Sequence, residues 1–398
     1  MPPDLLTATI TRWIGFFAMA ALIGSLAVDL LILRDDGAPH AERRRLQRLR
    51  VASVIALILV SMAEVFLRGR TMTGTGLSGV LSAVPSILGR THFGHVWVIR
   101  FVLLAAALCA ACSLRRATRV VTLGAAIGVA FTTAATGHAG DWGDLSLSAA
   151  IDWVHVVASS VWVGGLLSLA VAGRSRGAPI WPSPLFETIA RRFSRLAGWS
   201  LLAVVSSGSY NAWVQVRTPA ALWSTTYGRV LCIKVLLVAG IVWLGAASRY
   251  TIVARLGRPE PGGLLARLFR MQWAWLFGAR ETAPSMLPSR LLRYVSREAC
   301  LGIVVLACSA ILADSTPARH AVHLDHHAGS DAMLVNTTEL HARGDIPSKR
   351  ISDPLPGSES SVHHCPRAPS PGTVMRQSGR PVSDDGNLGR CSKENEQS

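Results

Sequence analysis

The feature that most constrains the fold of this chain is a series of apolar runs, each approaching the length of helix that crosses a lipid bilayer. A bilayer core takes about 20 residues of α-helix. Only 16% of the 398 residues are charged, whereas soluble domains carry roughly a quarter. We therefore predict an all-α, polytopic transmembrane helix bundle of about eight spans that lies in the lipid bilayer. The runs are residues 13–33, 51–67, 95–114, 118–136, 150–173, 196–216, 228–247 and 292–313.

The formal charge of +16 indicates orientation rather than nucleic-acid binding. Basic residues crowd the connections 34–50, 115–119, 174–195 and 249–293, whereas 137–149 has none. Because basic loops stay on the cytoplasmic side, both termini are predicted outside. A basic face for nucleic acid would need these arginines together on one soluble surface, so no nucleic-acid partner is expected. The first apolar run lacks a small-residue cleavage site and is interpreted as a retained span.

Composition divides the chain into two parts. Residues 1–315 are predicted to form the transmembrane domain, interrupted by an outer hydrophilic loop at 68–94 and an inner one at 248–291 that has the pattern of an interfacial amphipathic helix. Residues 316–398 turn abruptly to Ser, Pro, Gly, His and charge. We interpret them as a disordered, His-containing tail.

His155 is the ionisable residue of most interest, because such a group within a span is costly unless it faces a cavity, a partner or a ligand. Asp152, Ser159 and Trp162 share its helical face. The carboxylate of Asp152 would then orient the imidazole as a metal ligand. The alternative is a histidine that only hydrogen-bonds between helices.

Other candidate metal ligands gather at the predicted outer ends of spans. His138 and Asp141 follow the fourth run, and His92 and His95 lie at the outer end of the third. The first pair suits a metal entry site, although helix ends also attract polar caps without further function.

Met19 and Met62 fall in the outer halves of the first two runs. Thioether and imidazole together suit Cu(I) better than they suit hard cations. A methionine in a span is otherwise a packing residue.

Three further groups are left with two readings each. Cys109 and Cys112, one turn apart, either receive a soft metal or only pack. The tail residues His323, His326 and His327, with their neighbours, form a weak metal-capturing arm or a tail without function. Arg100 and Lys234 either extend to the interface or pair with a carboxylate such as that of Glu64.

Taken in order along residues 10–315, these motifs make the chain resemble the copper resistance protein D family of the CopD and PcoD type. The most specific piece is the span segment His155-Val-Val-Ala-Ser-Ser-Val-Trp162-Val-Gly164-Gly165-Leu. The others are Phe93-Gly94 with Trp97 and Arg100, Gly137-His138-Ala139, Phe193-Ser194, Gly208, Asn211 and Trp213, and Thr226-Tyr227-Gly228-Arg229 with Lys234.

The resemblance implies a bundle of about eight helices in a bacterial inner membrane that moves copper from the periplasm towards the cytoplasm. His138 and His155 would bind the metal, no enzymatic activity is expected, and a periplasmic copper-binding protein of CopC type would be a separate partner chain.

Two alternatives remain at this point. His138 and His155 on neighbouring helices are also suited to be axial ligands of a b-type haem. A factor that delivers copper to a membrane oxidase without transporting it is the other.

Overall fold

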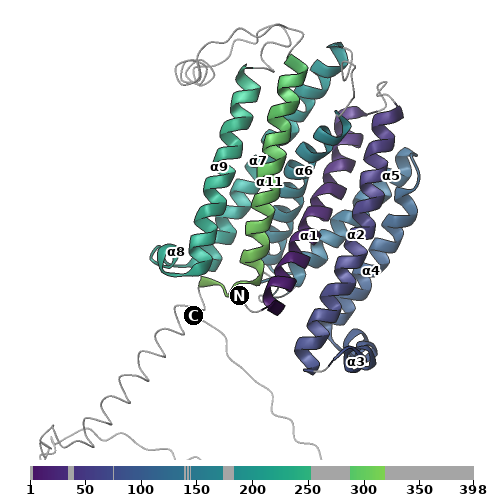
Figure 1. The fold of residues 1–398 in the computed structure, drawn as a ribbon, viewed down its shortest axis with the longest axis vertical. Helices are drawn as coiled ribbons and strands as arrows, with labels where there is room; N and C mark the ends of the chain where they lie inside the picture. The colour runs from purple at the N-terminus through teal and green to yellow at the C-terminus, as the bar shows by residue number, and fades with distance from the viewer. Residues whose placement is uncertain are drawn as a thin grey trace, which may run out of the picture. The chain divides into compact units, whose positions relative to one another are not determined.

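The computed structural model describes residues 3–34, 40–74, 76–138, 140, 143, 145–173, 183–251 and 287–318, and these are almost entirely helical (Figure 1). The all-α prediction is confirmed. The helices are α1 (Pro3–Ala27), the π-helix η1 (Val28–Leu33), α2 (His40–Thr73), α3 (Leu77–Arg90), α4 (His92–Ala111), α5 (Arg116–Ala135), α6 (Leu147–Ala172), α7 (Ser183–Val216), α8 (Ala221–Ser224), α9 (Thr226–Thr251) and α11 (Leu287–Asp314).

Within the described residues, seven helical segments are long and apolar enough to cross a membrane, and the chain is a multi-pass membrane protein. The run at 196–216, expected as another span, lies in α7, which is long enough but is not among the seven. The region 68–94, expected as a loop, is instead mostly helix. There α2 continues to Thr73, and α3 packs against α2 and α4.

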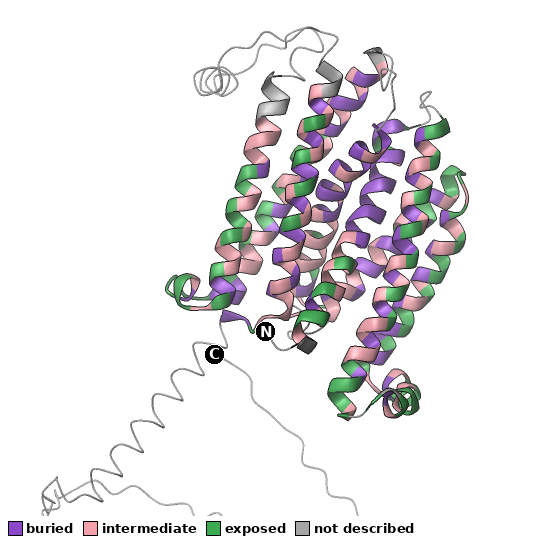
Figure 2. Cartoon of the chain, viewed as in Figure 1, coloured by how far each residue is buried: buried purple, intermediate pink, exposed green. Residues whose placement is uncertain are grey.

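Helix α1 is the central element, because it packs against α2, α5, α6 and α11 (Figures 1 and 2). Its closest approach is to α6, where Gly24 faces Gly164. A Cβ atom at Gly164 would collide with the carbonyl of Ala20, so only glycine allows the two backbones to meet. Gly164 therefore serves helix packing, as small residues do in membrane bundles.

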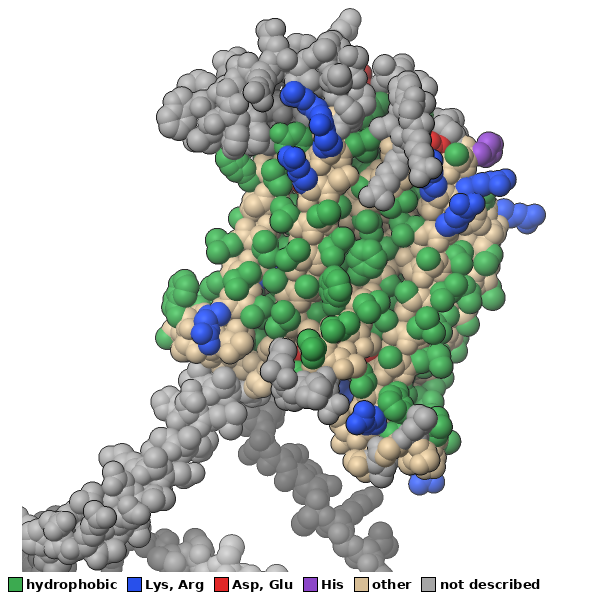
Figure 3. Space-filling model, viewed as in Figure 1, with side chains coloured by type: hydrophobic (Ala, Val, Ile, Leu, Met, Phe, Trp, Pro, Cys, Tyr) green, Lys and Arg blue, Asp and Glu red, His purple; other side chains and the backbone are tan. Residues whose placement is uncertain are grey.

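The bundle has two distinct ends. At one end α1, α6 and α9 begin while α7 and α11 finish, and this is the His138 end. The opposite one, where α2, α5 and α11 begin, is the Arg50 end. Figure 3 shows hydrophobic side chains covering the middle of the visible face, with Lys and Arg towards its two ends, as a bilayer requires.

A buried ionic cluster fixes the Arg50 end. The carboxylate of Asp29, fully buried in η1, accepts hydrogen bonds from Arg50 at 2.6 Å, Arg119 at 2.9 Å and Arg43 at 3.4 Å. Arg192 of α7 donates to the carbonyl of Ile32 in the same π-helix. Arginines from α2, α5 and α7 therefore converge on η1 and tie the helix ends together.

Candidate functional site

A cavity of about 400 Å³ opens between α1, α6, α7, α9 and α11 and occupies the half of the bundle nearer the His138 end. Its wall is mostly apolar, with a small set of polar side chains directed into it. The polar and thioether residues that line it include Arg12, Met19, His138, Asp152, His155, Ser159, Asn211, Gln215, Lys234 and Ser309.

The imidazole of His155 is held by the neighbouring helix α7. Its Nδ1 lies 3.0 Å from the hydroxyl oxygen of Ser207. The Ser207 hydroxyl donates to the carbonyl of Ala203 at 2.5 Å, so its oxygen accepts the proton of Nδ1–H. This arrangement assigns the proton of the neutral ring to Nδ1 and leaves the lone pair on Nε2.

The close packing of His155 against α7 depends on Gly208. A Cβ atom at this position would lie 3.0 Å from Cε1 of the imidazole. Ser207 and Gly208 thus provide the hydrogen bond and the space that place the ring.

The sequence contains a signal for this face of α7 that the motif analysis did not use. Ser207, Asn211 and Gln215 recur every four residues, which puts polar groups on one side of a membrane helix. Such a stripe indicates an internal cavity rather than lipid.

Asp152, Ser159 and Trp162 line the cavity together with His155, as the shared helical face predicts. The expected partnership between Asp152 and the imidazole is replaced by another. Asp152 accepts a hydrogen bond from Asn211 Nδ2 at 2.9 Å, while Ser207 holds the His155 ring. The hydrogen bond between His155 and Ser207 is also what we expect if His155 only holds α6 and α7 together.

The charges of this cavity are balanced. Lys234 and Asp152 face the same space and are close enough for their charges to interact. At the cavity mouth, Arg12 pairs with Asp314 of α11 at 2.8 Å. Because opposite charges lie near each other both inside the cavity and at its mouth, the electrostatic cost of burying these groups stays low.

The structure brings together three of the predicted ligands and separates three others. His138, His155 and Met19 line the one cavity. Met62 does not line it, because its side chain lies on the outer surface of α2 and is 57% exposed. His92 and His95 are exposed at the start of α4.

The remaining predicted ligands, Asp141, His323, His326 and His327, lie outside the described residues, as does most of the inner loop predicted at 248–291. Within the described part of the chain, no three His, Cys, Asp or Glu side chains cluster as a metal site. Any metal held in the cavity would therefore need ligands of mixed type, such as imidazole with thioether. Cys109 of α4 and Cys112, which directly follows this helix, are exposed.

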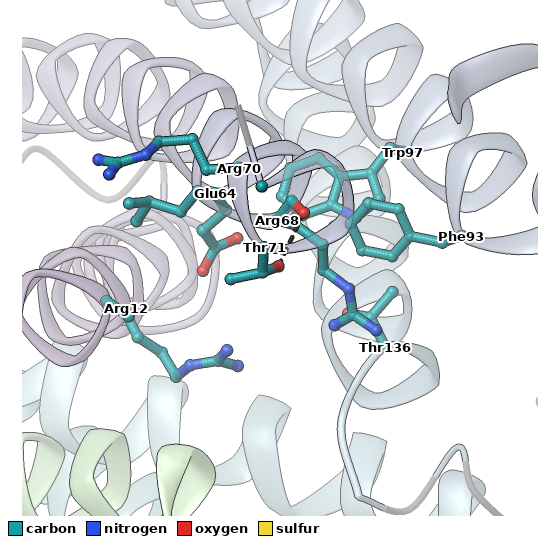
Figure 4. A pocket seen from close by; sticks show the side chains of 11 residues that line it. Arg12, Glu64, Arg68, Arg70, Thr71, Phe93, Trp97 and Thr136 are labelled. Carbon is teal, nitrogen blue, oxygen red and sulfur yellow. Dashed lines mark hydrogen bonds between the residues drawn. The ribbon is translucent and has the colours of Figure 1, made fainter. Parts of the chain in front are cut away.

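A second hollow of about 400 Å³ lies at the same end of the bundle and shares Arg12 with the first (Figure 4). Glu64, Arg68 and Thr71 of α2 face it, opposite Phe93 and Trp97 of α4. Its basic character makes it a poor primary site for a cation.

Arg100 supports the wall of that hollow from within the bundle. Its guanidinium stacks on Trp97 and donates to Glu64 at 3.3 Å, which confirms Glu64 as its carboxylate partner. It also donates to the hydroxyls of Thr132 and Thr133. Arg100 is therefore a structural residue.

Comparison with known families decides what this bundle is. The family model "Copper resistance protein D-like, N-terminal domain" matches residues 3–145, and the model "Copper resistance protein D" matches residues 187–312. The chain belongs to the copper resistance protein D family. Helix α6, which carries His155, falls between the two matched regions and contacts helices of both.

Two relatives illustrate the range of this family. The chain is 26% identical over 276 residues to "Copper transport protein CutJ" of Bacillus subtilis, a match that covers 66% of this chain and 49% of the relative. It is 25% identical over 275 residues to "Inner membrane protein YebZ" of Escherichia coli, covering 67% and 88%. The chain thus spans about half the length of the first. No solved structure matches it.

Proposed function

We propose that this protein is a copper transporter of the bacterial inner membrane that binds copper in the cavity at His155 and passes it from the periplasm towards the cytoplasm. The observation that carries the proposal is a half-buried imidazole, oriented by α7, in a membrane cavity that extends to one end of the bundle. Membership in a family described by copper resistance supports copper as the substrate, as does a relative named for copper transport.

The donor set favours Cu(I). Since Ser207 engages Nδ1, the lone pair of Nε2 is the one that binds metal, and the tautomer is already correct before copper arrives. Met19 lines the same cavity and adds a thioether. Imidazole and thioether are ligands that soft monovalent copper accepts and that hard cations such as Mg²⁺ do not prefer.

Entry takes place at the His138 end. His138 and Gly137 line the mouth. The ion pair of Arg12 with Asp314, and the opposite charges of Lys234 and Asp152 in the same cavity, leave the route without a large net charge against a cation. The ionic cluster around Asp29 lies at the other end, where the arginines of α2 and α5 are concentrated. By the positive-inside rule that end is cytoplasmic, so the His138 end faces the periplasm and a CopC-type copper donor.

The test measures binding and transport on the same protein. Full-length protein, purified and reconstituted into liposomes, is assayed for Cu(I) affinity by chelator competition and for copper uptake. We expect His155→Ala to lower the affinity at least about tenfold, since even residues that only orient a ligand cost about 10–100-fold, and to abolish uptake. His95→Ala, an exposed histidine outside the cavity, is the matched control.

The outcomes separate the candidate functions. Copper binding that survives His155→Ala removes the cavity as the site. Binding at His155 without uptake by the wild-type protein favours delivery to an oxidase instead of transport. A Soret absorption band in the purified protein, lost with His155→Ala, favours the haem protein.

A further inference from the structure

The hollow drawn in Figure 4 lies where the apolar part of α2 ends. It has a volume of about 400 Å³ and is walled by residues of α1, α2 and α4 at the His138 end of the bundle. The apolar run 51–67 stops just before Arg68, and Trp97 stands in the second turn of α4. Where a span leaves the hydrocarbon it meets the headgroup layer, and tryptophans concentrate at that level. The hollow therefore faces the phosphates of the bilayer.

Arginine determines the charge of this hollow. Arg12, Arg68 and Arg70 line it, and Glu64 is the one carboxylate among its described lining residues. Glu64 is paired with Arg100 at 3.3 Å, and Arg12 has its own carboxylate partner on α11. Within the described part of the chain, Arg68 and Arg70 pair with no carboxylate. The hollow thus keeps two positive charges that an anion can offset.

Arg68 is held in a suitable position for an anion. Its guanidinium carbon lies 4.6 Å from the centre of the Phe93 ring. In Figure 4 the guanidinium groups of Arg68 and Arg12 approach the same space from two different helices, while that of Arg70 lies further away at the rim. A guanidinium stacked on a ring keeps its N–H donors at the edge, in the fork that matches phosphate oxygens.

Trp97 adds a donor that has no acceptor. This residue lines the hollow and is only 2% exposed, and its Nε1 has no hydrogen-bond partner among the described residues. A buried indole N–H usually finds one. A ligand rich in acceptor oxygens is the kind that supplies it, whereas a cation is not.

The size and lining of the hollow favour a headgroup over a bare ion. Sites for small molecules measure about 300–1,000 Å³, and this hollow reaches that range. Ala8 and Leu67 provide apolar surface beside the arginines. A phospholipid combines the two requirements, because its phosphate is anionic and the chains attached through its glycerol are apolar.

We propose that this hollow binds the phosphate group of an anionic phospholipid from the leaflet at the His138 end. Arg68 and Arg12 bind the phosphate, Arg70 adds positive charge at the rim, and the glycerol lies along the apolar wall. A free phosphate ester has the same binding chemistry, so the experiment must separate the two sources. The inference does not depend on copper transport.

The experiment measures lipid binding to the full-length protein in detergent by native mass spectrometry. Phosphatidylglycerol is the probe, and phosphatidylcholine, which carries a phosphate but no net charge, is the reference. We expect the wild-type protein to prefer phosphatidylglycerol. The double variant Arg68→Gln with Arg70→Gln should lower that affinity about tenfold or more, because each basic residue near an anionic lipid contributes to binding.

The control removes the same charge from the same end of the bundle. Arg90→Gln with Arg217→Gln replaces two exposed arginines that do not line the hollow, and the affinity for phosphatidylglycerol should stay at the wild-type value. Both double variants should keep the wild-type unfolding temperature, since all four side chains are exposed. A lower affinity in the first variant then reports the site and not the fold.

Inorganic phosphate distinguishes the two sources of the ligand. It is added as a competitor to the lipid-bound protein and is also tested alone by equilibrium dialysis. Lipid that stays bound in excess phosphate supports the lipid headgroup. Phosphate that binds alone and displaces the lipid overturns the lipid and assigns the hollow to a free phosphate ester.

Three further results overturn the inference. The first is equal phosphatidylglycerol affinity for the wild type and the Arg68 and Arg70 variant. The second is an equal loss in the control variant, because the attraction would then come from the whole basic end. The third is equal affinity of the wild type for phosphatidylglycerol and phosphatidylcholine.

Discussion

The two sides of this bundle differ in how they are packed. Around α1, α2, α4 and α5, apolar side chains form a continuous core, and three arginines close around Asp29. Between α6, α7, α9 and α11, another apolar core leaves two cavities, that of His155 and one of about 250 Å³ nearer the Arg50 end. In the most apolar stretch of the first span, which includes α1, 78% of the residues are buried, whereas in that of α9 only 6% are buried.

This difference indicates which helices can move without losing many contacts. Helix α9 packs chiefly on α11 and α8, so a change in its position disturbs few contacts. Helix α1 cannot shift without breaking its glycine contact with α6 and the cluster at η1. We infer that α1, α2, α4 and α5 form a rigid frame, and that α6, α7, α9 and α11 form the part that would bind copper in the proposed function.

The strongest way to break this comparison is to remove the charge at the centre of the frame. Asp29→Ala leaves Arg50 and Arg119 buried without their carboxylate and should destabilise the protein by about 3–5 kcal/mol. Thermal unfolding in detergent measures this, with Glu187→Ala, which breaks an exposed pair worth at most about 1 kcal/mol, as control. Equal shifts for the two variants would show that the cluster does not hold the frame.

The glycine contact provides a smaller effect of the same kind. Gly164→Ala forces α1 and α6 apart and should cost about 1–3 kcal/mol, as overpacking does. Gly240→Ala on α9 meets nothing within 4 Å, and it should be neutral or stabilising by up to about 1 kcal/mol because alanine favours helix. The comparison is wrong if both substitutions move the unfolding temperature in the same direction by the same amount.

The smallest stability effect is expected at the His155 cavity, where Cu(I) affinity is the more sensitive measurement. Ser207→Ala removes one hydrogen bond between helices, worth less than about 1 kcal/mol in a membrane. Cu(I) affinity should nevertheless fall about tenfold, because the tautomer and orientation of His155 are no longer set. Chelator competition measures this, and Ser309→Ala, on the opposite wall of the cavity, is the control. An unchanged affinity would mean that the ring needs no support from α7.

Much of the fold was predictable from the sequence. Each of the eight apolar runs lies within the helices of the structure or extends at most three residues beyond them, because crossing a bilayer dictates length and hydrophobicity residue by residue. The region 68–94 was predicted wrongly as a loop, since its Gly and Thr residues weaken a pattern that packing of α3 on α2 and α4 overrides.

The site was predictable only in part. His155, Asp152 and Trp162 were placed on one face by helical spacing, and the structure keeps them there. Met62 was grouped with Met19 by depth along the chain, yet depth does not give the direction of a side chain around a helix. Met62 consequently faces away from the cavity.

The sequence by itself determined that this chain enters a membrane, which segments form its helices, and which faces of those helices carry polar groups, because each of these follows from local composition and period. Only the tertiary structure decided that α7 orients His155, that Asn211 donates a hydrogen bond to Asp152, and that Trp162 and Glu298 line one cavity. Those pairings join residues far apart in the chain, and their partners are set by how the helices pack rather than by any local pattern.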